Sequence, residues 1–319
     1  MILVFSEKDD ISAMKTRQWL EFFNAHFIVL ENTSLIDLDQ KIRFEGGTQN
    51  LSFVHKGMRV YMNQINVVWN RRGMIKMMAI PPDLINQQVS ASSLNRHFYE
   101  EQKALADYFY YQLKQKKCIN FQHNYNVNKL ITLSKAQEHG IAVPDTLIGR
   151  HFPEFSHECR YVTKNLQDVF SYSTDSHYVC DSVKEVEVSK RSVNDTFFYS
   201  LFQKKISSVY EIRTFFFMDL WYSLAIFPAK TIDYREHVHQ SPPRMVPIQL
   251  PTEYKKKLQG LMADLDLNSG SIDTLYDGKE YYFLEVNPVG QFDFVSGIGN
   301  YYIERDIALK LKQLDENEQ

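Results

Sequence analysis

Cysteine is scarce in this chain: Cys118, Cys159 and Cys180 are scattered over 319 residues. The odd number argues against a disulfide framework, and the spacing is not that of a metal site. We therefore expect reduced thiols and a cytoplasmic protein.

The sequence also lacks long apolar runs and a large excess of charge of one sign. No window of about 18 apolar residues exists, so the sequence predicts no membrane span. The apolar opening Met1–Phe5 lacks a basic region before it, and charged residues follow at once, so it predicts a buried strand rather than a signal peptide. The net charge of −3 indicates neither nucleic-acid binding nor an anionic-membrane surface.

What remains is an ordinary globular composition, with 44% hydrophobic and 24% charged residues. A chain of 319 residues suits two or three packed lobes better than one core. In the first lobe, short apolar runs alternate with helical stretches, which predicts a wound, partly parallel α/β sheet. The expected strands are 2–5, 27–30, 51–55 and 67–70, and the expected helices are 13–24 and 92–115.

The most informative segment lies near the carboxyl end. Two apolar-rich runs, 272–276 and 281–286, flank Asp277-Gly278, a strong hairpin signal. An antiparallel hairpin brings Asp273 close to Glu285 and Asn287, and these last two share a strand face because they are two residues apart.

Three oxygen donors gathered in this way suit Mg²⁺, which binds through a few carboxylates together with nucleotide phosphates. The alternative is a surface hairpin with scattered polar residues. The Glu285-Val-Asn-Pro run at the end of the strand favours the metal site.

The Asp273…Glu285-x-Asn287 arrangement resembles the metal-binding residues of ATP-grasp ligases, which activate a carboxylate as an acyl phosphate. The continuation Phe283-Leu-Glu-Val-Asn-Pro-Val-Gly-Gln-Phe292 resembles more closely the graspetide ligases, the microviridin-like crosslinkers of peptide side chains, and within them the grasp-with-spasm maturases. The resemblance implies an ATP-grasp fold of the α/β (α+β) class. It also implies an N-terminal wound lobe (1–125), a central lobe (126–200) and a C-terminal lobe (201–319) with metal and acceptor sites.

The same resemblance implies a set of ATP-binding residues. Lys129, at the start of a helix that Gly140 ends, and Lys164, at the end of a strand, match lysines that contact phosphates. Without the resemblance, Lys129 is an ordinary lysine at a helix start. The segment 202–206 resembles the strand that reads adenine, and Glu211 and Arg213 resemble the ribose-binding acid and the arginine at the γ-phosphate. The implied ATP site contains Lys129, Lys164, Gln203, Lys204, Ile206 and Glu211, and the implied cofactors are ATP and Mg²⁺.

Two arginine-containing elements are candidates for peptide contacts. Asp233 and Arg235 share a face in Thr231-Ile-Asp-Tyr-Arg235 and resemble the acceptor-site motif of graspetide ligases. Arg235 would hold the acidic side chain and Asp233 would orient or deprotonate a hydroxyl, unless the two form a surface ion pair. Arg71 and Arg72 follow a strand at the edge where such sheets collect ligands. They would face an acidic peptide, or else form a solvated basic turn.

The chain departs from the wider superfamily in one respect. Many ATP-grasp enzymes fold a glycine-rich loop over the phosphates, whereas residues 166–185 contain no glycine. We expect the phosphate contacts to depend more on Lys164, Arg213 and the metals. The charged stretch 183–194 is either a solvated edge or a leader-docking surface. The strand expected over 214–227 is aromatic, and we expect its phenylalanines and Trp221 in the core.

The implied activity is ATP-driven crosslinking of Glu or Asp side chains to Thr, Ser or Lys side chains in a ribosomal precursor peptide with a leader and a Thr/Glu/Asp-rich core. Ester products and a homodimer are expected from the resemblance alone. Two alternatives are a ligase for free amino acids or a protein C-terminus, and a non-catalytic nucleotide-dependent peptide-binding protein. The pair Gly297 and Gly299 is a weak dinucleotide-loop signal, because no third glycine follows. It is better explained as the segment before a final helix over 303–314.

Overall fold

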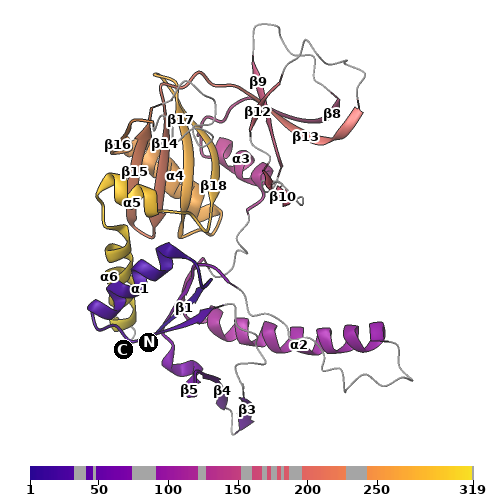
Figure 1. Ribbon diagram of the computed structural model, residues 1–319, viewed down its shortest axis with the longest axis vertical. Coiled ribbons are helices and arrows are strands. Elements are labelled where there is room, and N and C mark those ends of the chain that lie inside the picture. Colours follow the sequence, from indigo (N-terminus) through magenta and orange to yellow (C-terminus); the bar gives the residue numbers. More distant parts are fainter. Residues whose placement is uncertain are drawn as a thin grey trace. The chain divides into compact units, whose positions relative to one another are not determined.

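A computed structural model gives the structure of the chain, which divides into two compact units (Figure 1). Unit 1 contains residues 1–122 and 302–319, and unit 2 contains residues 123–301. The structure describes all residues except 32–40, 46–47, 74–90, 121–126, 152–159, 167–170, 174–177, 181–182, 187–195, 228–242 and 318–319.

Unit 1 is built on a four-stranded parallel sheet with the order β2-β1-β6-β7. All five residues of β1 are buried, as expected for a parallel strand that is covered on both faces. The wound sheet is confirmed, and the predicted strands 2–5, 27–30 and 67–70 match to within one residue. The strands are β1 (Ile2–Ser6), β2 (Phe27–Glu31), β6 (Val67–Asn70) and β7 (Lys117–Ile119).

A second, antiparallel sheet in unit 1 packs against helix α2 (Ala91–Lys114). Phe53 of this sheet meets Phe109 of α2, with ring centroids 5.6 Å apart, in a core that also contains residues of β1. Residues 51–55, predicted as a strand, lie in β4. The elements are β3 (Lys41–Glu45), β4 (Thr48–His55), β5 (Met58–Tyr61) and the 3₁₀ turn η2 (Met62–Gln64).

The last helix, α6 (Ile303–Glu316), belongs to unit 1, whereas the sequence placed it in a C-terminal lobe of 201–319. It packs against α1 (Ile11–Phe22) because its apolar residues Ile303, Ile307 and Leu311 form one buried stripe. The Met1 amino group contacts Asp315 Oδ1 at 2.5 Å. The chain therefore returns to its first unit at its end.

Unit 2 contains a small antiparallel sheet with the order β12-β9-β13-β8 and a separate hairpin, β10–β11. Helix α3 (Lys129–Glu138) precedes them and ends before Gly140, which has φ +62°, as the sequence predicts. The strands are β8 (Thr146–His151), β9 (Tyr161–Lys164), β10 (Ser171–Ser173), β11 (Tyr178–Cys180), β12 (Lys184–Glu185) and β13 (Thr196–Lys204).

A five-stranded antiparallel sheet, with the order β16-β15-β14-β17-β18, forms the rest of unit 2 (Figure 1). Helix α4 packs on the face that contains Phe216 and Ile272, whereas Phe292, just before α5, contacts Phe215 on the opposite face. The elements are β14 (Tyr210–Phe217), β15 (Leu220–Ile226), β16 (Met245–Ile248), α4 (Thr252–Asp264), β17 (Ser269–Tyr276), β18 (Tyr281–Asn287) and α5 (Asp293–Gly299).

The single strand predicted over 214–227 is wrong, because this stretch contains a hairpin. β14 ends at Phe217, Met218 adopts φ +55°, and Phe217 pairs with Leu220 of β15. A two-residue turn of this kind usually contains glycine or asparagine, and Met218-Asp219 contains neither. The burial of Phe215, Phe216 and Phe217 is confirmed, whereas Trp221 is only half-buried.

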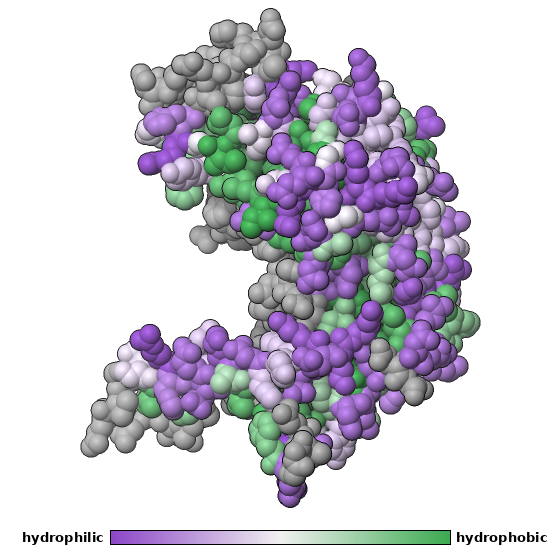
Figure 2. All heavy atoms as spheres, turned by 180° about the vertical axis from the view of Figure 1, so that it is seen from behind, coloured by the Kyte–Doolittle hydropathy of each residue, from purple (hydrophilic) through white to green (hydrophobic). Residues whose placement is uncertain are grey.

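Among the described residues, no helix has both the length and the apolar character that crossing a bilayer requires. Figure 2 shows mainly hydrophilic side chains on the face it displays, with smaller hydrophobic areas between them.

Candidate functional site

The predicted hairpin forms from β17 and β18. Asp273 pairs directly with Glu285, and Ser271 pairs with Asn287. In the turn, Gly278 has φ +100°, and Asp277 Oδ1 accepts hydrogen bonds from the backbone N–H groups of Lys279 and Glu280, each at 2.8 Å. The central geometric prediction from the sequence is therefore confirmed: the two carboxylates are cross-strand neighbours.

A β-bulge at Leu284 decides where Glu285 points. Thr274 pairs with Phe283 and Asp273 with Glu285, so Leu284 is an extra residue on β18. Phe283 and Val286 are both buried in the core under α4, although they are three residues apart. In a regular strand they would lie on opposite faces, and Glu285 would share the core face with Phe283. The bulge turns Glu285 away from the core.

Strand β14 adds an arginine to the same face. Arg213 is the cross-strand partner of Asp273, and its Nη1 lies 2.6 Å from Asp273 Oδ1. Its Nη2 donates a hydrogen bond of 2.9 Å to Glu211 Oε1. The alternation of the strand places Glu211 and Arg213 on one face, while Ile212 between them is fully buried.

Two lysines from other elements converge on Glu285. Lys164 Nζ, at the end of β9, lies 3.7 Å from Glu285 Oε2, and Lys129 Nζ lies 3.5 Å from the same oxygen. Lys129 is held at the first position of α3 because Asn128 caps the helix and accepts hydrogen bonds from the Leu130 and Ile131 N–H groups. These contacts bring α3, β9 and the hairpin together around one carboxylate.

The protonation behaviour of this cluster follows from burial and mutual charge. Burial lowers the pKa of Lys164, and the Lys129 charge adds to this, while Glu285 and Asp273 partly offset it. Burial alone would raise the pKa of Glu285, but the charges of Lys164, Lys129 and Arg213 hold that pKa below its ordinary value. Glu285 therefore stays ionised.

The cluster is electrically balanced: three acids, Glu211, Asp273 and Glu285, face three bases, Lys129, Lys164 and Arg213. Enclosing six charges is unfavourable for folding, because apolar residues of the same volume often pack as well or better. Such clusters are more typical of functional sites. Asp273 is 6% exposed and the Arg213 side chain is 14% exposed, so this pair is largely shielded from water, whereas the Glu285 side chain is 34% exposed.

The donor chemistry fits magnesium. Asp273 and Glu285 are hard oxygen ligands at directly paired positions, and both now contact cations that a metal and phosphates can replace. No group of three or more His, Cys, Asp or Glu side chains suited to a metal occurs in the part of the chain that the structure describes. The metal would therefore depend on two carboxylates, with Asn287 or a phosphate completing its ligands.

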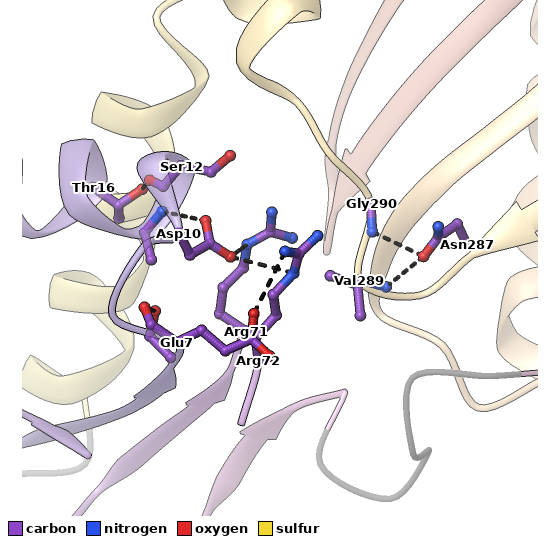
Figure 3. A network of polar contacts seen from close by, with 11 residues as sticks. Glu7, Asp10, Ser12, Thr16, Arg71, Arg72, Asn287, Val289 and Gly290 are labelled. Atoms are coloured by element: carbon purple, nitrogen blue, oxygen red, sulfur yellow. Dashed lines mark hydrogen bonds and ion pairs between the residues drawn. The ribbon is translucent and has the colours of Figure 1, made fainter. Parts of the chain in front are cut away.

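The Asn287 side chain also stabilises the backbone that follows β18. Its Oδ1 accepts hydrogen bonds from the Val289 and Gly290 N–H groups at 3.1 and 3.2 Å (Figure 3). Gly290 has φ +47°, and a Cβ there would lie 2.7 Å from the Ser271 backbone nitrogen. The chain after β18 is thus folded tightly over β17, with Asn287 at the bend.

Replacing Gly290 with alanine is expected to lower the free energy of unfolding by about 2 kcal/mol or more, from left-handed strain and the contact with Ser271. Gly297→Ala is the matched control, because Gly297 lies in α5 and an added Cβ there would point into open space, with no packing neighbour within 4 Å among the described residues. Thermal unfolding of both variants checks this. Equal melting temperatures for G290A and the unchanged protein would contradict the packing described for this bend.

The predicted base-reading segment lies at the end of β13. Gln203 is buried and donates a hydrogen bond of 3.0 Å from Nε2 to Thr146 Oγ1. Lys204 ends the strand and pairs with Asp145 at 3.6 Å, and Ile206 follows in a half-buried loop. The strand is confirmed for residues 202–204, whereas Lys205 and Ile206 lie beyond its end, and the contact of these residues with a nucleotide stays a prediction.

Residues 166–185, which lack the glycines of the usual phosphate-binding loop, include the strand pair β10–β11. In it, Ser171 pairs with Cys180 and Ser173 with Tyr178. The pair Gly297 and Gly299 lies within α5, so it does not form a dinucleotide loop, and the final helix predicted over 303–314 is confirmed as α6.

In unit 1, the predicted peptide-contacting arginines take part in a local ion-pair network (Figure 3). Arg71 is 3% exposed, and its Nε lies 3.2 Å from Asp10 Oδ2; Arg72 Nε lies 3.4 Å from the same oxygen. Asp10 also caps α1 by accepting from the Ala13 N–H at 3.0 Å. Arg71 therefore has a structural role at the carboxyl ends of β1 and β6, and only Arg72 is partly accessible. Their contact with a peptide stays a prediction.

The acceptor-site candidates Asp233 and Arg235 lie outside the described residues, as does most of the loop around them.

No family model matches the chain, and no curated protein matches it. Solved structures do match over nearly its whole length. A RiPP-associated ATP-grasp ligase from Chryseobacterium gregarium, in complex with ADP and a leader and core peptide, is 18% identical with a TM-score of 0.78, over 100% of this chain and 97% of that one. Macrocyclase MdnC from Microcystis aeruginosa, bound with precursor peptide MdnA, is 20% identical with a TM-score of 0.68, over 98% and 99%.

The ATP-grasp ligase PsnB, complexed with minimal precursor, Mg and ADP, is 16% identical with a TM-score of 0.69, over 98% of this chain and 97% of that one. These similarities establish the fold: the chain has the ATP-grasp fold, as the hairpin motif implied.

Proposed function

We propose that this chain is an ATP-dependent ligase that activates Glu or Asp side chains of a ribosomal precursor peptide and joins them to other side chains of the same peptide. The observation that carries the proposal is the balanced cluster around the β17–β18 hairpin, in which Arg213, Lys164 and Lys129 contact the carboxylates of Asp273 and Glu285. ATP-grasp ligases of the same fold supply the context, since solved examples are complexed with ADP, Mg and precursor peptides.

Each side chain of the cluster has a distinct task in this proposal. Lys164, Lys129 and Arg213 would contact phosphate oxygens of bound ATP. Asp273 and Glu285 would hold magnesium, together with Asn287 once its Oδ1 is released from the Val289 and Gly290 N–H groups. Magnesium ions, when bound, neutralise the charge that builds on the β- and γ-phosphate oxygens. Arg213, held by Glu211 on the same face of β14, supplies a preorganised positive charge where the acidic side chain attacks the γ-phosphate.

The adenine base of ATP would lie along the end of β13. Backbone groups of residues 204–206 would read its edge, and Glu211 would accept from the ribose. A free N–H or C=O group in such a segment recognises adenine without a charged side chain. The backbone N–H groups of Lys204 and Lys205 already bond to Asp145 and Arg160, each at 2.8 Å, so Ile206 is the best-placed donor.

The second half-reaction requires a nucleophile and an acceptor site. A Thr or Ser hydroxyl, or a Lys amine, displaces phosphate from the acyl phosphate and closes a ring. Because both reacting groups belong to one peptide, their effective concentration favours ring closure. Asp233 and Arg235 are our candidates for this site, and Arg72 is a candidate for a further contact with an acidic peptide.

The finer expectations belong to the same proposal. Grasp-with-spasm ligases are the resembled group, which favours ester products, a cytoplasmic enzyme and a homodimer. A leader segment of the precursor would deliver the core peptide, since a short core offers little surface for recognition.

Incubation with ATP, Mg²⁺ and a Thr- and Glu/Asp-rich precursor encoded beside the gene tests the proposal. We expect the peptide to lose the mass of one water per bond formed, with one ADP released for each. Free amino acids are the comparison substrate. Loss of ATP with free amino acids but an unchanged peptide would favour the free-substrate ligase, and nucleotide binding without any ADP release would favour a binding protein.

A further inference from the structure

Lys205, the residue that follows β13, makes one backbone hydrogen bond and one side-chain ion pair with neighbouring segments. Its backbone N–H donates to the Arg160 carbonyl at 2.8 Å, and its Nζ lies 2.7 Å from Glu185 Oε2. Glu185 also contacts Arg160, with Nη1 3.5 Å from its Oε1. Three strand ends are thereby joined, because Arg160 precedes β9, Glu185 ends β12, and Lys205 follows β13.

These two contacts hold the start of the segment that connects β13 to β14. Beyond Lys204 the chain leaves the small sheet and crosses to β14, with a hydrogen bond from the Ser208 N–H to the Ile206 carbonyl at 3.0 Å on the way. The contact between Lys205 and Glu185 is therefore the side-chain anchor nearest to Ile206 among the residues that the structure describes. Its geometry is set by β12, which pairs with β9 through Lys184–Thr163 and Glu185–Val162.

The anchor is better shielded than an ordinary surface ion pair. The side chains of Lys205 and Glu185 are 22% and 26% exposed, whereas the neighbouring pair, Lys204 and Asp145, is 42% and 80% exposed at 3.6 Å. The hydrogen bond from Lys205 holds the pKa of Glu185 below its ordinary value, so the carboxylate stays charged at neutral pH. Shorter and drier pairs hold their geometry better than exposed ones.

We propose that Glu185 is a positioning residue for nucleotide binding: through Lys205 it holds residues 204–206 in the conformation that reads the base. This rests on the proposed function, because it assumes that a nucleotide lies along the end of β13. No local pattern indicated this role, since residues 183–194 have the mixed charge of a solvated edge. A preorganised segment binds with less loss of conformational freedom.

Glu185→Gln tests the proposal, with Asp145→Asn as the matched control on the exposed neighbouring pair. Calorimetric titration with ATP and with inorganic tripolyphosphate separates the base from the phosphates. We expect E185Q to weaken ATP binding about three- to tenfold and to leave tripolyphosphate binding unchanged, while D145N alters neither. Lys205→Gln, which removes the other partner of the same ion pair, should weaken ATP binding to a similar extent.

Several outcomes would overturn the proposal. Equal ATP affinity of E185Q and the unchanged protein would exclude a positioning role, and an equal loss for ATP and tripolyphosphate would indicate a general change in the site rather than in base reading. In either case the proposed ligase function stands. If the unchanged protein binds no ATP at all in the presence of Mg²⁺, the proposed function itself fails, and the role of Glu185 fails with it.

Discussion

Replacing Asp273 with asparagine is expected to lower the rate of peptide-dependent ADP formation on the order of 10²- to 10³-fold, the loss typical of one preorganised charge at a transition state. Asp273 contacts Arg213 at 2.6 Å and pairs directly with Glu285, so in the proposed site its charge would serve both the metal and the arginine. The Mg²⁺ concentration for half-maximal rate should rise as well. Rates measured over a magnesium series check both effects.

Asp277→Asn is the control for this experiment. Asp277 belongs to the same hairpin, but its carboxylate caps the turn by accepting from the Lys279 and Glu280 N–H groups, which an asparagine oxygen can also do. Its magnesium dependence should match that of the unchanged protein. Equal rates for D273N and D277N would show that the hairpin holds no catalytic metal.

Replacing Lys164 with alanine is expected to weaken ATP binding roughly 10- to 100-fold, because a charge-assisted contact to a phosphate contributes about 1.5–3 kcal/mol. The Lys164 side chain is 13% exposed and lies at the end of β9, where its position is fixed by pairing with Leu201 of β13. The effect should be larger than for an exposed lysine, since a shielded charge acts through a lower dielectric constant.

Lys135→Ala is the matched control, because Lys135 lies on α3 and contacts Asp264, away from Glu285. Titration with ATP in excess Mg²⁺ measures both variants. If K164A and K135A bind ATP equally well, Lys164 does not contact the triphosphate, and the arrangement of phosphates proposed here is wrong.

The sequence predicted the hairpin correctly because its signals are local. Asp277-Gly278 marks the turn, and both strands are apolar enough to be recognised, whereas the direct pairing of Asp273 with Glu285 requires the bulge at Leu284. The parallel sheet of unit 1 was predictable for the same reason. The resemblance to ATP-grasp ligases then supplied Lys129 and Lys164, whose convergence on Glu285 no local pattern contains.

The features that the sequence did not predict depend on contacts between residues far apart in the chain. The bulge at Leu284 follows from the burial of both Phe283 and Val286, and that burial is visible only once α4 covers the sheet. The turn at Met218 lacks glycine, so an aromatic hairpin looked like one strand. The return of α6 to unit 1 depends on its buried stripe meeting α1, a contact between the two ends of the chain. Such long-range pairings leave no mark in a short window of sequence.

A crystal structure with Mg²⁺ and a non-hydrolysable ATP analogue tests the central claim most directly. We predict a metal bound by the carboxylates of Asp273 and Glu285, with the triphosphate beside Lys164 and Arg213. A triphosphate bound elsewhere, with Asp273 still paired to Arg213 and no metal at Glu285, would contradict this claim.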